Sequence, residues 1–268
     1  MTATAGTSRA LILARGLGTR MRAAASVTLD PDQAAAADAG VKAMMPFGRP
    51  FLDFVLQSLA DAGVTDVGLV LGPEHDQVRA YYRSLHTPRL RITFIEQVEP
   101  LGTANAVASA RAWTGTGPFI VLNADNLYPG DVLAQLVCGR SPALPGFARD
   151  SLGIPIERIG AFALLEVRED GSLARIVEKP GVEVMEAAGP RALVSMNLWR
   201  FDDRIFEACE AVPVSERGER ELPQAVALAV QQGMRIDVIP AHGPVLDLSS
   251  RTDVPAVARA LEGRSVRL

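Results

Sequence analysis

Short apolar runs of strand length alternate with helical patterns through the first half of this 268-residue chain. Residues 118–122 (PFIVL) form a continuous apolar run of the kind that is buried on both faces of a parallel sheet. Strands are predicted at 10–14, 67–71, 90–95 and 118–122, and helices at 50–63, 74–84 and 103–113, the last capped by Thr103. Repeated strand–helix units of this length favour an open α/β sheet with right-handed crossovers.

The second half of the chain is less regular. The Asp170-Gly171 step favours a tight turn, which predicts a hairpin made of residues 159–167 and 173–177. The other predicted elements are strands at 192–201, 235–239 and 245–248 and helices at 222–232 and 254–261. The sequence shows no internal repeat and no low-complexity linker. We therefore expect one compact domain spanning residues 1–268.

Composition excludes several classes of protein. Hydrophobic residues make up 48% and charged residues 22%, which is typical of globular chains and argues against disorder. The net charge is −4 without long like-charge runs, so nucleic acid is not an expected partner. No apolar run approaches the roughly 20 residues of a membrane span, and the start of the chain lacks a signal-peptide pattern. Cys138 and Cys209 are too few for a disulfide framework, so we expect a cytoplasmic location.

A glycine turn follows the first predicted strand, in residues 11–22 (LILARGLGTRMR). Gly16 and Gly18 would let backbone amides approach a phosphate, and Arg20 supplies positive charge just after the turn. Met21 stands where the dinucleotide-binding fingerprint requires a third glycine, and no Gly-Lys-Ser/Thr follows for a P-loop. The turn alone therefore leaves two interpretations open, a phosphate-binding loop and an ordinary glycine turn with surface arginines.

Further motifs favour the phosphate-binding interpretation. Residues 11–22 resemble the LAxGxGTRM/L signature of sugar-1-phosphate nucleotidyltransferases, the pyrophosphorylases that make nucleotide sugars. The other landmarks of that family follow in its order, namely Lys42 with Pro46, the helix at 50–63, Gln97 with Pro100-Leu101-Gly102-Thr103-Ala104 and Ala106, Asp125, Glu178-Lys179-Pro180, Ser195-Met196-Asn197, Arg217-Gly218-Glu219 with Leu222, and Asp247. The resemblance covers nearly the whole chain, from Leu11 to about Leu261.

Together with the alternating pattern, this resemblance implies a fold. We expect an α/β protein, a three-layer α/β/α sandwich with a mostly parallel, Rossmann-like (GT-A-like) sheet and a small inserted hairpin region for the sugar. The nucleotide-binding part would span about residues 9–140, and the sugar-phosphate-binding part about residues 150–268.

The resemblance also implies a reaction and its residues. An NTP and a sugar 1-phosphate would give an NDP-sugar and pyrophosphate, through Mg²⁺-dependent in-line attack on the α-phosphate. Arg20 would contact the β,γ-phosphates, Lys42 the α-phosphate region and Lys179 the sugar phosphate. The nucleotide would be bound by Leu13, Ala14, Gly16, Gly18, Thr19, Gln97, Gly102 and Thr103, with Gln97 and Gly102 at the base. The sugar would be bound by Gly160, Glu178, Ser195 and Asn197, and Mg²⁺ by Asp125 and Asp247.

The chemistry of these positions agrees with such roles. Asp125 follows a predicted strand, so its carboxylate is expected at the carboxyl edge of the sheet, where open α/β sheets bind ligands. Asp247 ends another apolar run, and Mg²⁺ prefers one or two carboxylates plus phosphate oxygens. The alternative for each aspartate is a helix cap or a loop acid. For Glu178 and Lys179 the alternative is a solvated hairpin edge, and for Gln97 an exposed loop side chain.

Several segments depart from the family pattern, including Asn123-Ala124 and Asn197, which replace glycines. Arg15 replaces a small residue before Gly16, and a large cation there would crowd or contact the nucleotide. Residues 248–250 (LSS) replace the x-G-T that usually follows the second aspartate. The segment 23–41 is long and is expected to hold a short helix that Asp30 caps and Gly40 ends. It is either a lid that closes over the nucleotide or a surface loop that makes no contact with substrate.

Two other functions stay open. One is another nucleotide-handling enzyme on the same fold, such as a glycosyltransferase or a cofactor guanylyltransferase. The other is a non-catalytic module that senses nucleotide sugars, which the altered residues 248–250 would suit. The sequence does not name the base or the sugar, which could be a cyclitol, and a homo-oligomer is an open option.

Overall fold

The computed structural model describes residues 6–16, 18–23, 25–154 and 156–268. Its centre is a parallel sheet built from the first four strands, in the order β3-β2-β1-β4. These strands are β1 (Arg9–Leu13), β2 (Asp66–Leu71), β3 (Arg91–Glu96) and β4 (Phe119–Asn123). Leu11 lies opposite both Gly68 of β2 and Val121 of β4. The four predicted strands of the first half are thereby confirmed, with shifts of a few residues at their ends.

The sheet continues beyond β4 with strands of mixed direction, in the order β10-β6-β9-β7-β8, and β11 pairs with β6. These strands are β6 (Ala143–Ala148), β7 (Ala163–Val167), β8 (Leu173–Val177), β9 (Leu193–Ser195), β10 (Leu198–Phe201) and β11 (Asp237–Ala241). Strands β6, β7 and β11 run in the direction of β1–β4, whereas β8, β9 and β10 run against it. A separate two-stranded sheet joins β5 (Asn126–Leu127) to β12 (Leu246–Asp247).

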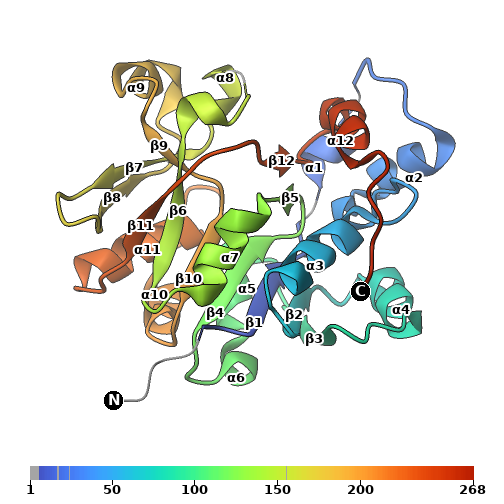
Figure 1. Cartoon of the computed structure of the whole chain (residues 1–268), viewed down its shortest axis with the longest axis horizontal. Coiled ribbons are helices and arrows are strands. Elements are labelled where there is room, and N and C mark those ends of the chain that lie inside the picture. Colours follow the sequence, from blue (N-terminus) through green and yellow to red (C-terminus); the bar gives the residue numbers. More distant parts are fainter. Residues whose placement is uncertain (1–5, 17, 24, 155) are drawn as a thin grey trace.

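Helices cover both faces of the large sheet (Figure 1). Successive residues of β1 alternate between two hydrophobic cores, with Ala10 and Ile12 in one and Leu11 and Leu13 in the other. One core is completed by α3 (Phe51–Asp61), α4 (Asp76–Ser84), α7 (Gly130–Cys138) and α12 (Val254–Leu261). The other core is completed by α5 (Thr103–Ala108), α10 (Ile205–Ala211) and α11 (Leu222–Gln231). The predicted three-layer α/β/α sandwich with mostly parallel strands is confirmed.

Short elements occupy the connections. They are the helices α1 (Thr19–Arg22), α2 (Pro31–Ala39), α6 (Arg111–Thr114), α8 (Ile156–Ile159) and α9 (Gly181–Ala187), and the 3-10 turns η1 (Lys42–Met44), η2 (Arg149–Ser151) and η3 (Arg251–Asp253). Helix α2 has the predicted ends, because the Asp30 side chain accepts from the N–H of Gln33 and Gly40 has a φ of 73°. No helix formed by the described residues is long and apolar enough to span a bilayer.

Several predicted elements were wrong. The helix predicted at 103–113 divides into α5 and α6, and Gly102 rather than Thr103 occupies its N-cap position. The strand predicted at 192–201 divides into β9 and β10, because Asn197 has a left-handed φ of 57° that a strand cannot accommodate. The first hairpin strand begins at Ala163, since residues 156–159 form α8.

Sequence analysis missed strand β6 and helices α9 and α10. Strand β6 contains Pro145 and Gly146, which read as strand-breaking residues in a sequence. It forms nonetheless because it is buried along its whole length and pairs with β11, with Pro145 opposite Ile239. Tertiary burial has overridden local propensity at this position.

Candidate active site

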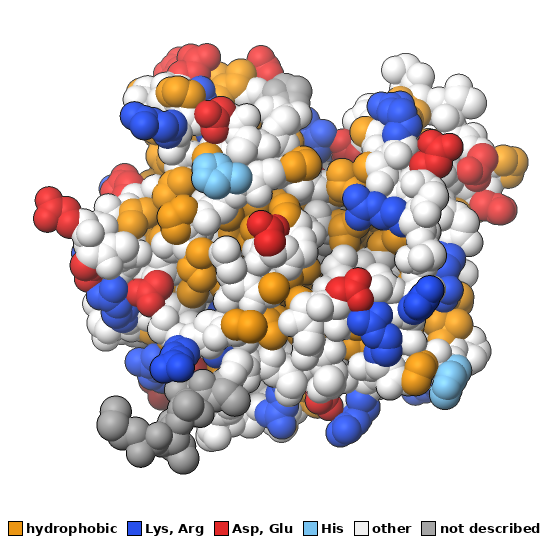
Figure 2. Space-filling view, viewed as in Figure 1, with side chains coloured by type: hydrophobic (Ala, Val, Ile, Leu, Met, Phe, Trp, Pro, Cys, Tyr) orange, Lys and Arg blue, Asp and Glu red, His pale blue; other side chains and the backbone are white. Residues whose placement is uncertain are grey.

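A pocket of about 270 Å³ opens at the carboxyl edge of the parallel sheet, where β1 and β4 end. Figure 2 shows the molecule hollowed on this side, between the part that carries α8 and α9 and the part that carries α1, α2 and α12. The sequence-predicted residues that line the pocket are Leu13, Ala14, Gly16, Arg20, Lys42, Gln97, Gly102, Thr103 and Asp125. Residues from four well-separated segments therefore meet where an open α/β sheet binds its ligand.

The glycine turn after β1 packs against the segment that carries Lys42. Gly18 has a φ of 63°, and a Cβ on it would lie 2.2 Å from the carbonyl oxygen of Gly40. Only glycine allows that approach, which brings the two backbones into contact just before η1. Gly16 lines the pocket with open space around it, whereas Gly18 and Thr19 do not line it. Leu17 lies outside the described residues.

Lys42 and Asp125 form an ion pair at the pocket wall. Asp125 lies in the turn between β4 and β5, and its carbonyl oxygen accepts a 2.8 Å hydrogen bond from the N–H of Leu248. The side chains of Lys42 and Asp125 are 15% and 16% exposed, so both remain accessible from the pocket. This pair, together with Arg20 on α1, places two cations and one carboxylate on the same cavity.

Asp247 lies close to Asp125 but does not line the pocket. It is opposite Asn126 in the β5–β12 pair, and its carboxylate accepts from Ser249 at 2.7 Å and from Arg158 at 3.0 Å. Burial raises the pKa of Asp247, and the negative charge of Asp125 raises it further. Such a pair of mutually repelling carboxylates is the donor set that suits a hard divalent cation.

The described residues contain no group of three or more His, Cys, Asp or Glu side chains able to hold a metal ion. A cation at Asp125 and Asp247 would thus take its remaining ligands from substrate or water. This fits Mg²⁺, which commonly binds one or two carboxylates together with phosphate oxygens.

Gln97 and Gly102 form the opposite wall of the pocket. The Gln97 Nε2 donates to the carbonyl oxygen of Gly102 at 3.0 Å and to Oδ1 of Asn105 at 2.8 Å. Gly102 has a φ of 100°, and a Cβ there would lie 2.5 Å from the carbonyl oxygen of Arg220. The segment that carries Arg220 belongs to the second half of the chain, so both halves build this wall.

The pocket is also lined by residues to which sequence analysis gave no role. Glu219 lines it, next to Arg220, whose N–H donates to the carbonyl oxygen of Leu101 at 2.7 Å. The signal was present in the Arg217-Gly218-Glu219 motif, but the sequence does not show that this segment folds against the glutamine wall. Asn123, at the end of β4, also lines the pocket.

The predicted sugar-binding residues do not line this pocket. Lys179 has a φ of 47°, and its Nζ lies 3.3 Å from Oε1 of Glu178 and 3.9 Å from Oε2 of Glu221. Burial raises the pKa of Glu178, while the charge of Lys179 opposes that rise. Glu221 precedes Leu222, whose N–H donates to Oγ1 of Thr103 in the pocket wall at 2.8 Å. Lys179 is therefore linked to the pocket through one short segment.

The other predicted sugar-binding residues lie in two places. Gly160 packs beside the segment that follows Lys179, and Ser195 and Asn197 lie at and just after the end of β9. The carbonyl oxygen of Gly160 accepts from the N–H of Gly181 at 3.1 Å, and a Cβ on Gly160 would lie 3.0 Å from the backbone of Gly181. Ser195 is buried at the end of β9, and its Oγ accepts from the N–H of Asn197 at 3.4 Å.

Comparison with known proteins decides the family. The family model described as nucleotidyl transferase matches residues 9–242, which is most of the chain. This chain belongs to the nucleotidyl transferase family. The resemblance predicted from the glycine turn and the motifs after it is confirmed.

Relatives of this nucleotidyl transferase carry several substrate names. It is 30% identical over 257 residues to a glucose-1-phosphate thymidylyltransferase of Streptomyces antibioticus, covering 94% of this chain and 66% of that protein. The chain thus spans just under two thirds of the length of that relative.

Solved structures share the fold. A UDP-glucose pyrophosphorylase of Acinetobacter baumanii has a TM-score of 0.75 at 19% identity, over 96% of this chain and 95% of that one. An inositol-1-phosphate CTP transferase of T. maritima has a TM-score of 0.73 at 20% identity, over 98% of this chain and 100% of that one.

Proposed function

We propose that this nucleotidyl transferase joins an NTP and a sugar 1-phosphate to give an NDP-sugar and pyrophosphate. The observation that carries the proposal is the pocket, where Arg20, Lys42 and Asp125 line one cavity with Gln97. A phosphate oxygen of the sugar 1-phosphate attacks the α-phosphorus, and the bond to the oxygen that bridges to the β-phosphorus breaks. The attacking phosphate is already ionised, so positioning and charge neutralisation suffice for catalysis.

The residues divide the work between the two substrates. Arg20 binds the β,γ-phosphates and Lys42 the α-phosphate, while Gln97 and Gly102 contact the base. The remaining nucleotide contacts come from Leu13, Ala14, Gly16 and Thr103, which line the pocket, whereas Gly18 and Thr19 shape the glycine turn without lining it. Lys179 holds the sugar phosphate, with Glu178, Gly160, Ser195 and Asn197 around the sugar. These assignments place the nucleotide in residues 9–140 and the sugar in residues 150–268 of a single domain.

Asp125 and Asp247 are the residues that would hold a magnesium ion. When bound, Mg²⁺ supplies positive charge that neutralises the phosphates during transfer. Lys42 and Arg158 form ion pairs with these two carboxylates. Lys42 is thereby held at the pocket wall, in reach of an incoming phosphate.

Release of pyrophosphate from a panel of substrates tests this function. Each NTP is combined with sugar 1-phosphates and with a cyclitol phosphate, and the Lys42→Met variant serves as the inactive control. We expect release from one preferred pair and a loss of about 10²-fold or more in the variant. Transfer of a sugar onto an acceptor without pyrophosphate would indicate a glycosyltransferase. Binding of a nucleotide sugar without turnover would indicate a sensing module.

A further inference from the structure

Arg15, the cation that departs from the family pattern, lines the pocket and is held there by two partners. Its Nε lies 3.1 Å from Oε1 of Glu74, and its Nη2 lies 3.3 Å from Oε2 of the same carboxylate. Its Nη1 donates to the main-chain carbonyl oxygen of Gln97. Arg15 lines the pocket, but its side chain is only 8% exposed and its guanidinium group is engaged by the Glu74 carboxylate and the Gln97 carbonyl oxygen.

The contacts of the Arg15 guanidinium group join the segments that follow three neighbouring strands. Arg15 follows β1, Glu74 follows β2 and Gln97 follows β3, and all three positions lie at the carboxyl edge of the sheet. The pair runs directly over Gly72, where an added Cβ would lie 2.2 Å from Nε of Arg15 and 2.3 Å from the Glu74 carboxylate. A side chain at position 72 would therefore displace the Arg15–Glu74 pair from its present position.

Gln97 is fixed from both its backbone and its side chain. Its N–H donates to the carbonyl oxygen of Leu71 at 2.9 Å, and its own carbonyl oxygen accepts from Arg15. The side-chain Nε2 donates to the carbonyl oxygen of Gly102, which can only accept. This contact orients the amide, so that Oε1 is presented as a hydrogen-bond acceptor. Among the described residues, no group donates to Oε1.

We propose that Arg15, anchored by Glu74, is a positioning residue for recognition of the nucleobase, and this rests on the proposed function. By holding the Gln97 backbone, it fixes an acceptor for a ring N–H or exocyclic amino group of the base. An acceptor held in place before binding loses little entropy when the base arrives, and it discriminates by position as well as by chemistry. Without Arg15, the Gln97 carbonyl oxygen loses its side-chain donor, and the Glu74 carboxylate loses two of its contacts.

The Arg15→Met variant, which keeps the side-chain length and removes the guanidinium group, tests this inference. Binding of each NTP to the full chain is measured by calorimetry without sugar phosphate, and kcat/KM is measured for each NTP with it. We expect the ratio between the preferred and the next NTP to fall by roughly tenfold, the size of one lost hydrogen bond, with the KM for sugar phosphate unchanged. An unchanged ratio overturns the inference.

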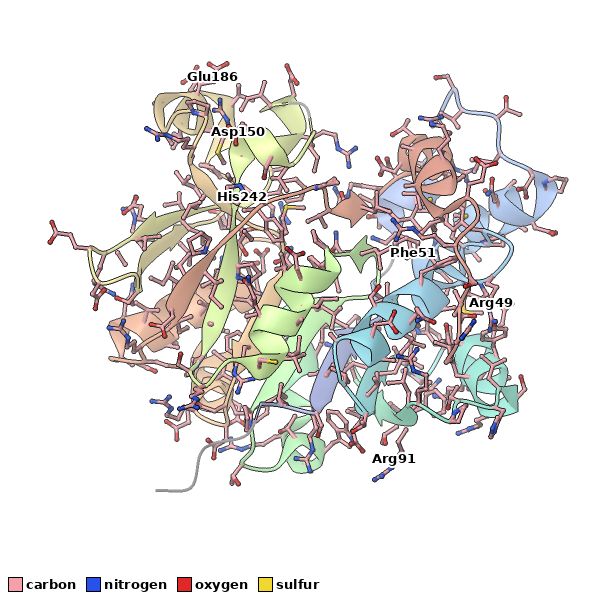
Figure 3. All side chains as sticks on the ribbon, in the orientation of Figure 1. Arg49, Phe51, Arg91, Asp150, Glu186 and His242 are labelled. Carbon is pink, nitrogen blue, oxygen red and sulfur yellow. The ribbon has the colours of Figure 1, made fainter. Side chains whose placement is uncertain are left out.

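Two further variants separate positioning from a general loss of stability. Arg91→Ala removes another arginine–carboxylate pair between β2 and β3, in which Arg91 lies 3.3 Å from Asp66. This pair lies at the opposite edge of the sheet, and Figure 3 shows Arg91 pointing away from the molecule. Arg91→Ala should leave the ratio unchanged. Glu74→Gln weakens the anchor of Arg15 but keeps a neutral hydrogen-bond partner for it. This variant should lower the selectivity ratio by less than Arg15→Met does, and it replaces Arg15→Met as the test if that variant does not fold. Loss of selectivity in Arg91→Ala, or none in Glu74→Gln, overturns the inference.

The calorimetric measurement of NTP binding also distinguishes failure of this inference from failure of the proposed function. If the wild-type chain binds NTPs selectively but releases no pyrophosphate, and Arg15→Met lowers the selectivity, the function fails and the inference stands. If the wild-type chain turns over and Arg15→Met keeps its selectivity, the function stands and the inference fails. Binding of all NTPs with equal affinity by the wild-type chain would contradict the inference.

Discussion

Lys42 and Asp125 form an ion pair although 83 residues separate them in the chain. One lies in the 3-10 turn η1 and the other in the turn between β4 and β5. The contact depends on Gly18, which lets the glycine turn pack against Gly40 immediately before η1. A carboxylate and an ammonium group thereby line the same pocket.

Replacing Asp125 by asparagine should abolish turnover without unfolding the chain. The change keeps the shape of the side chain but removes the negative charge expected to bind metal, which should lower kcat by about 10²–10³-fold or more. The measurement is pyrophosphate release at saturating Mg²⁺, beside a thermal unfolding curve. Asp131→Asn, an exposed acid in the first turn of α7, is the matched control and should keep full activity. Near-normal turnover in Asp125→Asn would disprove its role.

Arg20→Ala and Lys179→Ala should affect different substrates. Arg20 lines the pocket beside the glycine turn, so its loss should raise the KM for the NTP. Lys179 lies outside the pocket beside Glu178, so its loss should raise the KM for the sugar phosphate. Initial rates are measured with each substrate varied in turn. Arg22→Ala serves as the control on α1, because Arg22 donates to the carbonyl oxygen of Ala39. A rise in the same KM for both variants would contradict the assignment.

Thr103→Val should destabilise the protein by about 1 kcal/mol, the usual cost of a lost cap or partly buried hydrogen bond. The hydroxyl of Thr103 accepts from the N–H of Leu222, the first residue of α11. Valine has a similar shape but leaves that N–H without its partner. Urea unfolding gives the free energy of unfolding. Ser109→Ala on the same segment removes an exposed hydroxyl and should change stability by much less.

His75 should make the protein less stable as the pH falls. Burial lowers the pKa of His75 below its ordinary value of 6.5, and the nearby charge of Glu74 only partly opposes this. Below about pH 6.5 the unfolded chain therefore binds a proton that the folded chain does not, and the free energy of unfolding decreases by at most about 1.4 kcal/mol per pH unit. His75→Gln should remove this part of the slope, measured by denaturant unfolding from pH 5 to 8.

The control for that measurement is His86→Gln, which replaces an exposed histidine and should keep the wild-type slope. An identical slope in His75→Gln and the wild-type protein would show that His75 titrates alike in both states.

Segment 23–41 should gain protection from hydrogen exchange when an NTP and Mg²⁺ bind. Helix α2 within it is held by an ion pair between Asp38 and Arg251, and Val41 and Lys42 directly after it line the pocket. Contact of Lys42 with phosphate would pull on the segment and close it over the nucleotide. Exchange measured by mass spectrometry with and without NTP decides the matter. Unchanged exchange from residue 23 to residue 39 would mean that the segment is not a lid.

Local signals in the sequence were sufficient for much of the fold. The apolar run at 118–122 and its counterparts predicted β1–β4, since strands buried on both faces must be continuously hydrophobic. Asp30 and Gly40 predicted the ends of α2, because caps act through neighbouring backbone groups. Elements that depend on contacts distant in sequence were missed, because local signals do not report such contacts. β6 contains Pro145 and forms only because β10 and β11 lie beside it.

The sequence by itself determined the family and the carboxyl-edge position of Asp125, and it named several residues that line the pocket, among them Leu13, Lys42 and Gln97. Only the tertiary structure decided which side chains meet. Thr103 accepts from the first N–H of α11 instead of capping its own helix, and Arg15 contacts Glu74 and the Gln97 carbonyl oxygen. These partners are distant in sequence, and a hydrogen bond requires atoms within about 3 Å. That proximity is set by packing of whole elements, which no local pattern of residues encodes.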